Sequence, residues 1–221
     1  NYALAHVGIA DFYLWASIYG LISSREGYEL AERAARRALQ IDPELGEAYA
    51  SLGLITLNNF EYEKAERLLQ RSIDLVPHYS LVHEWYSAML IGTGRTEQGL
   101  KEIRLAEELD PMSLRTKTLV AWTTYQAGRF DDALAKAEEI ISFDENYPQG
   151  HIQRSYVLCE LGRADEAVES AVLANRLLPD TALAQYALCF ALAAAGRTDE
   201  VVALADEMEE RSAREFVKPM F

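Results

Sequence analysis

The residues most suggestive of catalysis form the run His83-Glu84-Trp85-Tyr86-Ser87. A His-Glu pair of this kind opens the H-E-x-x-H helix of zinc proteases, where two histidines one turn apart bind zinc and the glutamate acts as a general base. Ser87 stands where the second histidine is required. The run therefore predicts no zinc site, and we expect His83 to be a structural histidine that packs between helices.

The other residues that could do chemistry are equally isolated. His6, His78 and His151 are scattered and lack the spacing of metal ligands. The run Gly92-Thr93-Gly94 lacks the lysine of a phosphate-binding P-loop, and the sequence has no G-x-S-x-G nucleophile motif. We therefore expect a protein that is not an enzyme, with no catalytic residues, no metal site and no cofactor.

The two cysteines, Cys159 and Cys189, lie 30 residues apart and form no C-x-x-C pair. This spacing argues against both a zinc site and a disulfide-based scaffold. We expect the two thiols to behave as small buried apolar side chains. Two cysteines do not identify the redox compartment.

Composition and charge narrow the class of partner. The chain has 221 residues, of which 50% are apolar and 25% charged, as is typical of a folded soluble domain. Its 35 acidic and 21 basic residues give a formal charge of −14. Nucleic acids and anionic membranes are bound through clustered Lys and Arg, so this charge argues against both. Every apolar run is shorter than the roughly 18 residues of a transmembrane helix, so we expect no membrane insertion.

The positions that would carry any function are set by an internal repeat of 34 residues. Pro43, Pro77, Pro111 and Pro179 lie on one 34-residue grid, with Glu145 at the vacant position. A second series has the same period: Gly94-Arg95, Gly128-Arg129, Gly162-Arg163 and Gly196-Arg197. A helix–turn–helix unit of 34 residues is the signature of the tetratricopeptide repeat.

The segment 46–79 carries this repeat most clearly, since Tyr49, Leu52, Gly53, Tyr62, Ala65 and Pro77 occupy the expected positions. The whole chain thus resembles the tetratricopeptide-repeat family. The resemblance implies an all-α fold, a right-handed α-solenoid in which helix pairs stack into an α–α superhelix. We expect one domain over residues 1–221, at least about 70% helical and without a sheet. The expected motifs are 3–45, 46–79, 80–113, 114–147, 148–181 and 182–215, and residues 216–221 would begin a further helix.

Small residues and turns support this layout. Ala133 and Ala167 should be buried where the two helices of a pair cross, because a small side chain lets helices approach closely. The Gly-Arg turns suit a left-handed helix cap, and the acidic residues that follow them favour the positive end of the next helix.

The first motif is irregular. Leu4, Val7, Ile9 and Ala10 already suggest a helix, and the small residues of 20–27 suggest a break. We therefore expect a long loop near residues 18–26, followed by a helix from about Tyr28 to Ile41.

Two short runs point to a narrower resemblance. Gly8-Ile9-Ala10-Asp11-Phe12-Tyr13 and Asp42-Pro43-Glu44-Leu45 are similar to the repeat domains at the C-terminal end of bacterial multidomain regulators. Such proteins carry a winged-helix, nucleotide-cyclase or protein-kinase module at the other end. The resemblance implies a piece of a longer regulatory protein. It favours the bacterial cytoplasm, or the periplasm if the parent protein is tethered to a membrane.

In this family, fixed positions of the first helix of each repeat line a concave groove. Carried onto this sequence, they are Glu47, Ala50, Leu54, Leu57 and Asn58; Leu81, Glu84, Trp85, Ala88 and Ile91; Arg115, Thr118, Trp122, Tyr125 and Gln126; Gln149, Ile152, Gln153, Tyr156, Cys159 and Glu160; and Leu183, Tyr186, Phe190 and Ala193. The lysine and asparagine pattern that clamps a peptide carboxylate in chaperone adaptors is absent from them.

The most distinctive groove residues are aromatic. We select Arg115, Trp122, Tyr125, Gln126, Tyr156, Tyr186 and Phe190 as candidate binding residues. Aromatic rings bury a large area at low entropic cost, which suits an apolar or helical peptide, and Arg115 could meet an acidic group. The rings of adjacent repeats should form one neighbouring patch. The alternative is that several of these rings only pack helix against helix.

The sequence therefore favours a non-catalytic scaffold that binds a protein or peptide segment in an aromatic-lined groove. The alternative is a regulatory domain in which a small molecule in the groove controls an attached effector. Self-association through the terminal repeats is compatible with both, because Phe216, Val217, Met220 and Phe221 would leave an apolar end.

Overall fold

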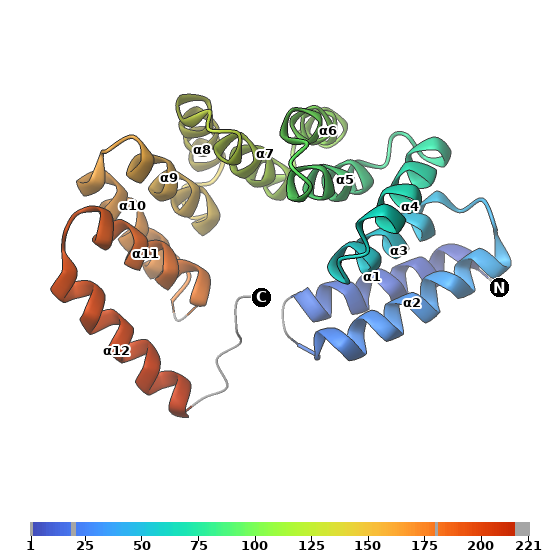
Figure 1. The fold of residues 1–221 in the computed structure, drawn as a ribbon, viewed down its shortest axis with the longest axis horizontal. Coiled ribbons are helices and arrows are strands. Elements are labelled where there is room, and N and C mark those ends of the chain that lie inside the picture. Colours follow the sequence, from blue (N-terminus) through green and yellow to red (C-terminus); the bar gives the residue numbers. More distant parts are fainter. Residues whose placement is uncertain (1, 19–20, 180, 215–221) are drawn as a thin grey trace. The chain divides into compact units, whose positions relative to one another are not determined.

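A computed structural model describes residues 2–18, 21–179 and 181–214. Of these residues 82% are helical and none is in a strand, which confirms the predicted all-α fold. Figure 1 shows the helices in chain order. Their bounds are α1 Ala3–Ile18, α2 Ser24–Ile41, α3 Gly46–Asn58, α4 Tyr62–Leu75, α5 Ser80–Gly92, α6 Thr96–Leu109, α7 Leu114–Gln126, α8 Phe130–Phe143, α9 Pro148–Glu160, α10 Ala164–Leu177, α11 Ala182–Ala194 and α12 Thr198–Arg214.

The helices keep the period of the sequence. From α3 onward, the first helix of each pair begins at residue 46, 80, 114, 148 or 182, and the second at 62, 96, 130, 164 or 198. Both series advance by the 34 residues of the sequence repeat. Each pair is therefore one helix–turn–helix unit, as the repeat predicts.

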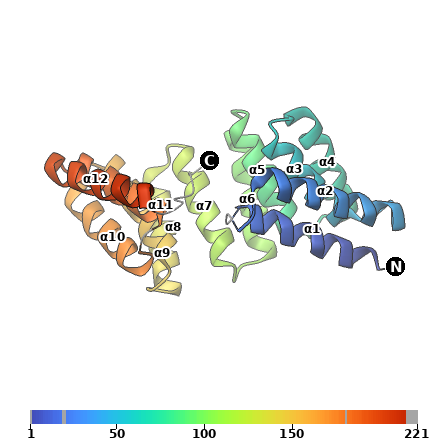
Figure 2. The same cartoon turned by 90° about the horizontal axis from the view of Figure 1, so that it is seen from below.

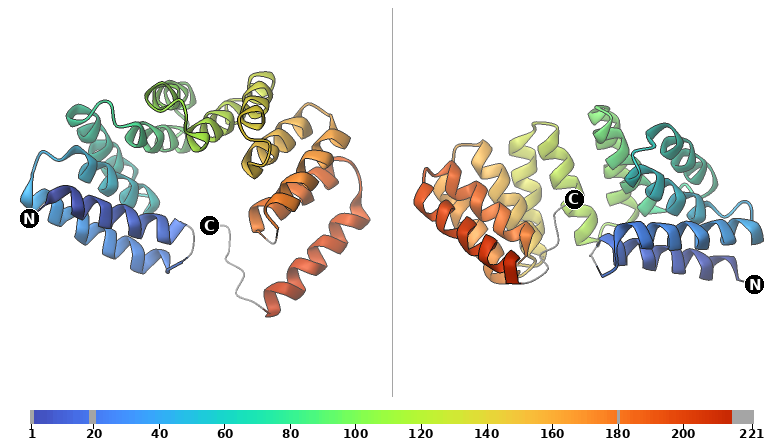
Figure 3. Two further views of the ribbon diagram at one scale, coloured as in Figure 1. Left: turned by 180° about the vertical axis from the view of Figure 1, so that it is seen from behind. Right: turned by 60° about the horizontal axis from the view of Figure 1, so that its bottom comes forward.

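The described helices fall into two compact units, one within residues 1–112 and the other within 113–221. In the first unit α3 packs against both α1 and α5, and each of these three helices also packs against its own partner helix, α2, α4 or α6 (Figure 2). The second unit repeats this arrangement with α7, α9 and α11 as the continuous row and α8, α10 and α12 as their partners (Figures 2 and 3). A face of the continuous row is thus built from three successive repeats.

Small residues occupy the helix crossings, as predicted. Ala133 on α8 and Ala167 on α10 are fully buried. At Gly53 on α3 an added Cβ would lie 2.6 Å from the Leu69 side chain of α4, closer than real contacts allow. These positions let the two helices of a pair approach closely, and no larger side chain fits without displacement.

The turns within the pairs take the predicted left-handed conformation. Gly94, Gly128, Gly162 and Gly196 have φ between 70° and 80°. Acidic residues occupy the first turn of the helix that follows, as at Asp131 and Asp132 of α8. The turn after α3 differs, because Phe60 occupies the glycine position with φ 61°.

The prediction for the first pair was partly wrong. The connection between α1 and α2 is shorter than the expected loop at 18–26, and α2 begins at Ser24, where Ser23 accepts a hydrogen bond from the Glu26 N–H. Gly27 lies inside α2, where an added Cβ would be 1.7 Å from the Ser17 hydroxyl of α1. It is therefore a close-packing residue, not a helix breaker. The predicted helix start at 216–221 lies outside the described residues.

His83 is structural, as predicted. Its side chain is 2% exposed, with Nδ1 2.7 Å from a Glu102 carboxylate oxygen and Nε2 2.9 Å from the Pro77 carbonyl oxygen. The equivalent residues of two other repeats bind the same carbonyl position: Tyr49 donates to Pro43 and His151 contacts that of Glu145. In these three repeats, the side chain thus connects the first helix to the turn that precedes it.

Candidate binding pocket

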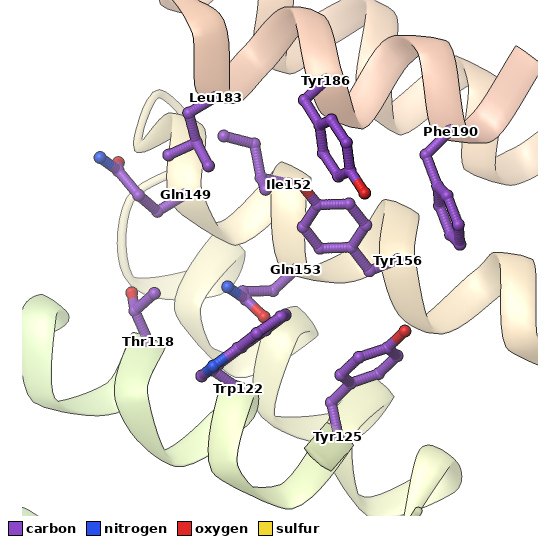
Figure 4. A pocket seen from close by; sticks show the side chains of 10 residues that line it. All are labelled: Thr118, Trp122, Tyr125, Gln149, Ile152, Gln153, Tyr156, Leu183, Tyr186 and Phe190. Atoms are coloured by element: carbon purple, nitrogen blue, oxygen red, sulfur yellow. The ribbon is translucent and has the colours of Figure 1, made fainter. Parts of the chain in front are cut away.

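The second unit contains a cavity of about 440 Å³ between α7, α9 and α11 (Figure 4). Its lining residues all come from the first helices of three successive repeats. They are Thr118, Trp122 and Tyr125 of α7, Gln149, Ile152, Gln153 and Tyr156 of α9, and Leu183, Tyr186 and Phe190 of α11. All ten belong to the groove positions expected from the repeat.

Helix geometry explains why these side chains meet. On each helix the lining residues are three, four or seven positions apart, apart from the adjacent Ile152 and Gln153 of α9, so they share one face. The repeat then places equivalent residues side by side on neighbouring helices. Trp122, Tyr156 and Phe190 are such a series, each 34 residues after the last.

Tyr156 lies at the centre of the aromatic lining. Its ring centroid is 6.1 Å from Trp122, 6.4 Å from Tyr125, 6.4 Å from Tyr186 and 5.8 Å from Phe190. Trp122 and Tyr125 stack at 5.3 Å with 22° between their planes. The predicted single aromatic patch of neighbouring repeats is therefore confirmed as a geometric feature.

The rings of the lining differ in their exposure to solvent. Tyr156 is only 8% exposed, so it also packs helix against helix. Trp122 is 37% and Tyr186 51% exposed, although both are large apolar side chains. Tyr156 therefore also packs between helices, whereas Trp122 and Tyr186 lie partly open to solvent at the cavity.

Two glutamines supply the main polar groups of the lining. The side-chain oxygens of Gln149 and Gln153 are buried, and neither has a hydrogen-bond partner among the described residues. Gln153 as a whole is 8% exposed. A buried amide oxygen without a partner is unusual in a folded protein, since it costs free energy that a donor would recover. The Tyr125 hydroxyl does have a partner, because it donates to the Glu160 carboxylate at 3.1 Å.

The pocket is electrically neutral over the ordinary pH range. None of the ten lining side chains is charged near neutral pH. Burial, helped by the hydrogen bond to Glu160, raises the pKa of Tyr125 to about 12. Burial also raises the pKa of Tyr156 well above its usual range, and that of the neighbouring Cys159 thiol to about 11. The cavity therefore offers apolar surface and amide groups but no ionic partner.

Two of the residues selected from the sequence do not line this cavity. Arg115 lies half-buried in the first turn of α7, one turn before Thr118, and Gln126 is exposed at the last position of that helix. The selection also passed over five lining residues: Thr118, Gln149, Ile152, Gln153 and Leu183. Their shared helical face with the aromatic residues was the available signal, and a selection made up mainly of aromatic side chains missed it.

The rest of the described chain adds no competing site of clear chemistry. A smaller cavity of about 230 Å³ lies beside Tyr86, Arg95 and Lys101 in the first unit. Two of its three charged side chains are already engaged, since Arg95 pairs with Glu66 and Glu102 contacts His83. Over residues 2–18, 21–179 and 181–214, no group of three His, Cys, Asp or Glu side chains could hold a metal ion. In that same part of the chain, no helix combines the length and apolar character needed to cross a bilayer.

Similarity to curated proteins is low and partial. No family model matches the sequence. The chain is 24% identical over 177 residues to anaphase-promoting complex subunit 3 of Schizosaccharomyces pombe, covering 79% of this chain and 26% of that protein. It is 25% identical over 142 residues to the transcriptional regulator HilA of Salmonella typhimurium, covering 64% of this chain and 26% of HilA. The chain thus spans about a quarter of the length of these curated relatives.

Solved structures identify the fold. PilW, a type IV pilus biogenesis factor, matches with a TM-score of 0.77 at 14% identity over 96% of this chain and 94% of PilW. YrrB, described as a TPR protein with an unusual peptide-binding site, matches with a TM-score of 0.59 at 18% identity over 84% of this chain and 91% of YrrB. The protein is an α-helical repeat domain. More narrowly, its fold is that of the tetratricopeptide repeat.

Proposed function

We propose that this domain is a non-catalytic protein-binding module that takes an apolar segment of a partner into the pocket between α7, α9 and α11. The observation that supports the proposal most directly is the lining itself: five aromatic rings, two of them substantially exposed, beside two glutamines whose buried side-chain oxygens have no partner among the described residues. Exposed aromatic side chains gathered around a cavity are typical of binding surfaces.

The chemistry of the pocket favours an apolar anchor. Aromatic rings contribute a large contact area and lose little side-chain entropy, so they often carry most of the energy of an interface. With no charged side chain in the lining, a peptide carboxylate would lose its hydration without gaining an ionic partner. The proposal therefore excludes a carboxylate clamp and assigns binding to burial of an uncharged segment.

The relatives are compatible with this function. YrrB is described as having a peptide-binding site, PilW acts in pilus biogenesis, and HilA is a transcriptional regulator. On the match to HilA and the two short runs near the N-terminus, we propose that the domain belongs to a longer bacterial regulator. Its partner would then be a protein segment of that regulatory system.

The cavity volume favours a second candidate function, the binding of an uncharged small molecule. About 440 Å³ lies within the range of roughly 300–1,000 Å³ that is usual for small-ligand sites. A screen of uncharged compounds for increased melting temperature addresses this candidate. Small-molecule binding is supported by a compound that raises the melting temperature of the wild-type domain but not that of a variant lacking the exposed rings of Trp122 and Tyr186.

A peptide selection tests the main proposal. Random dodecapeptides are displayed and selected on the immobilised domain, and the affinity of the enriched peptides is measured by fluorescence anisotropy. We expect apolar, uncharged sequences to be enriched. The double variant Trp122→Ala, Tyr186→Ala should weaken their binding by about thirtyfold or more, since each removes an aromatic anchor.

The matched control is Tyr62→Ala in the first unit, because Tyr62 is 38% exposed and lies outside the pocket. This control should bind the selected peptides as the wild type does. Failure to enrich any peptide, or equal loss in the control and the double variant, would contradict the proposal.

A further inference from the structure

We propose that two copies of this domain associate through α1, whose exposed face packs antiparallel against the same face of the second copy. The inference goes beyond the proposed function and is independent of it, because α1 belongs to the first unit and the pocket to the second. It identifies an interaction surface and names a second copy of the chain as its partner.

The first observation is that α1 carries apolar residues around nearly its whole circumference. Among its 16 residues Asp11 is the only acidic one, and Lys and Arg are absent. The Asp11 carboxylate accepts a hydrogen bond from the Ser51 hydroxyl of α3 at 2.8 Å, so it is directed toward that neighbouring helix. A helix that is apolar all round is normally buried all round. We therefore expect the exposed side of α1 to be covered by a partner.

The second observation is that α1 is covered on one side. Val7, Ala10 and Leu14 are buried, and within the first unit the helix packs against α2 and α3. Figure 2 shows α1 along the edge of that unit. The opposite face exposes 45% of Ile9 and 63% of Phe12. Single exposed apolar residues are ordinary, but a continuous exposed face of them marks an interaction site.

The third observation is the shape of this exposed face. Gly8 lies three residues after Ala5 and four before Phe12, with Ile9 beside it, so these four exposed residues share one face. A Cβ added at Gly8 would have nothing within 4 Å, so the helix backbone is open there, and Phe12 projects one turn further along. An antiparallel pair with its two-fold axis level with residue 10 places each Phe12 over Gly8 of the other copy. A parallel pair would instead place the two Phe12 rings against each other.

Charge and shape together favour a second copy as the occupant. The chain carries a formal charge of −14, so two copies repel each other unless they meet where neither is charged. The exposed face of α1 meets this condition, since its residues Leu4, Ala5, Gly8, Ile9 and Phe12 are all uncharged. It also offers a projecting ring and an open backbone position at matching spacing. A two-fold contact uses the same patch on both subunits and closes after two copies.

The size of the face sets the expected affinity. A helix of 16 residues is about 24 Å long and, at about 10 Å across, presents a face of a few hundred Å². This area is below the roughly 800 Å² that each partner contributes to a standard interface. We therefore expect a weak, reversible dimer with a dissociation constant of about 10–100 μM.

Sedimentation equilibrium of the domain tests the inference over a concentration range of about 2 to 500 μM, which spans the expected dissociation constant. We expect a monomer–dimer equilibrium that tightens as salt rises from about 50 to 500 mM, because salt screens the repulsion between two acidic copies. A chain that stays monomeric throughout would overturn the inference and leave the face to a partner of another kind. Assemblies larger than a dimer would also overturn it, because a two-fold contact is closed.

Paired charge variants test the antiparallel α1 contact directly. Ile9 lies next to the two-fold axis, so it faces Ile9 of the second copy. Ile9→Glu and Ile9→Lys should each weaken self-association by about tenfold or more, because like charges would meet in the interface. An equimolar mixture of the two variants should dimerise about tenfold more tightly than either variant alone, because opposite charges then meet. A mixture that associates no better than the separate variants would overturn the inference.

Gly8→Leu separates a loss of association from damage to the fold, and it decides the matter even if an Ile9 variant folds poorly. Leucine fills the position where Phe12 of the second copy packs, so self-association should weaken by about tenfold or more. The melting temperature of the dilute monomer should rise, because leucine favours a helix more than glycine does and its Cβ meets nothing. Val202→Ser on α12, where Val202 is 54% exposed, is the control and should dimerise as the wild type does. Unchanged association of Gly8→Leu, or an equal loss in the control, would overturn the inference.

Discussion

At the residue scale, Phe60 shows how one side chain departs from the repeat. Four other turns place glycine at the equivalent position, with φ of 70–80°. Phe60 adopts φ 61° with its ring 75% exposed, 6.3 Å from the ring of Tyr62. A left-handed conformation is unfavourable for any residue with a Cβ, and the exposed ring recovers little by burial. The position therefore stores strain.

This strain predicts that Phe60→Gly stabilises the domain. Glycine adopts the left-handed conformation without a steric cost, so we expect the free energy of unfolding to rise by about 1 kcal/mol. Urea denaturation measures the change. The neighbouring Asn59→Gly, where φ is −87°, should give no such gain. A loss of stability in Phe60→Gly would instead show that the contact with Tyr62 outweighs the strain.

His83 leads to a prediction about pH. Burial opposes protonation of its ring, but the hydrogen bonds to Glu102 and to the Pro77 carbonyl outweigh this effect and raise the pKa above its ordinary 6.5. Because the folded-state pKa is the higher one, protonated His83 stabilises the fold fully below the unfolded-state pKa. This stabilisation is lost as pH rises through the folded-state pKa.

We therefore expect the free energy of unfolding to decline as pH rises above about 6.5, the ordinary histidine pKa, and His83→Gln to remove that part of the decline. Denaturation at a series of pH values and the titration of the ring protons by NMR both report it. The exposed His78 serves as control through His78→Gln, which should leave the slope intact. A folded-state pKa at or below the ordinary value would contradict the assignment of the two hydrogen bonds.

At the element scale, the sequence repeat predicted the helix pairs because glycine and proline recur at their ends. The prediction was wrong about the start of α2, where Gly27 looks like a helix breaker. Whether a glycine breaks a helix or lets a neighbour approach depends on the packing partner, here Ser17, and no local pattern contains that information. The candidate site, too, was predictable from the sequence only in part. Periodicity predicted the aromatic face, but the unsatisfied state of Gln149 and Gln153 depends on three-dimensional surroundings.

The packing at the helix crossings predicts that phenylalanine destabilises the domain at one alanine of α8 and not at another. Ala133→Phe should overpack the contact between α7 and α8 and lower the free energy of unfolding by about 1–3 kcal/mol. Ala135→Phe, on the exposed face of the same helix, should change it by less than about 0.5 kcal/mol. Thermal and urea denaturation of both variants check the prediction. Equal stability of the two variants would mean that the crossing tolerates a large side chain and that the packing described is wrong.

At the scale of the whole molecule, the contrast lies between a strongly acidic chain and a neutral pocket. The formal charge of −14 disfavours acidic partners at long range, but the ten lining residues carry no charge of their own. Recognition in the pocket should then depend on the burial of apolar area, which is not an interaction between charges that salt screens.

This contrast predicts that a blocked, uncharged peptide binds with the same affinity, within about twofold, from about 50 to 500 mM salt, since no ion pair is there to be screened. The affinity should also be flat from about pH 5 to 9, because the pKa of Tyr125 is about 12 and its hydroxyl stays neutral over that range. Fluorescence anisotropy at each condition measures both. A tenfold loss at high salt would place the binding energy in ion pairs outside the pocket.

The most direct test of the central claim uses the three tryptophans of the chain as reporters. Trp122 lines the pocket of the second unit, whereas Trp15 and Trp85 belong to α1 and α5 of the first unit. The indole N–H signals are assigned with Trp122→Phe and followed by NMR while a selected, blocked peptide is added. We predict that the Trp122 signal shifts saturably with the affinity measured by anisotropy, while those of Trp15 and Trp85 do not move. A peptide that binds while Trp122 stays unchanged and Trp15 or Trp85 shifts would contradict the assignment of this pocket as the binding site.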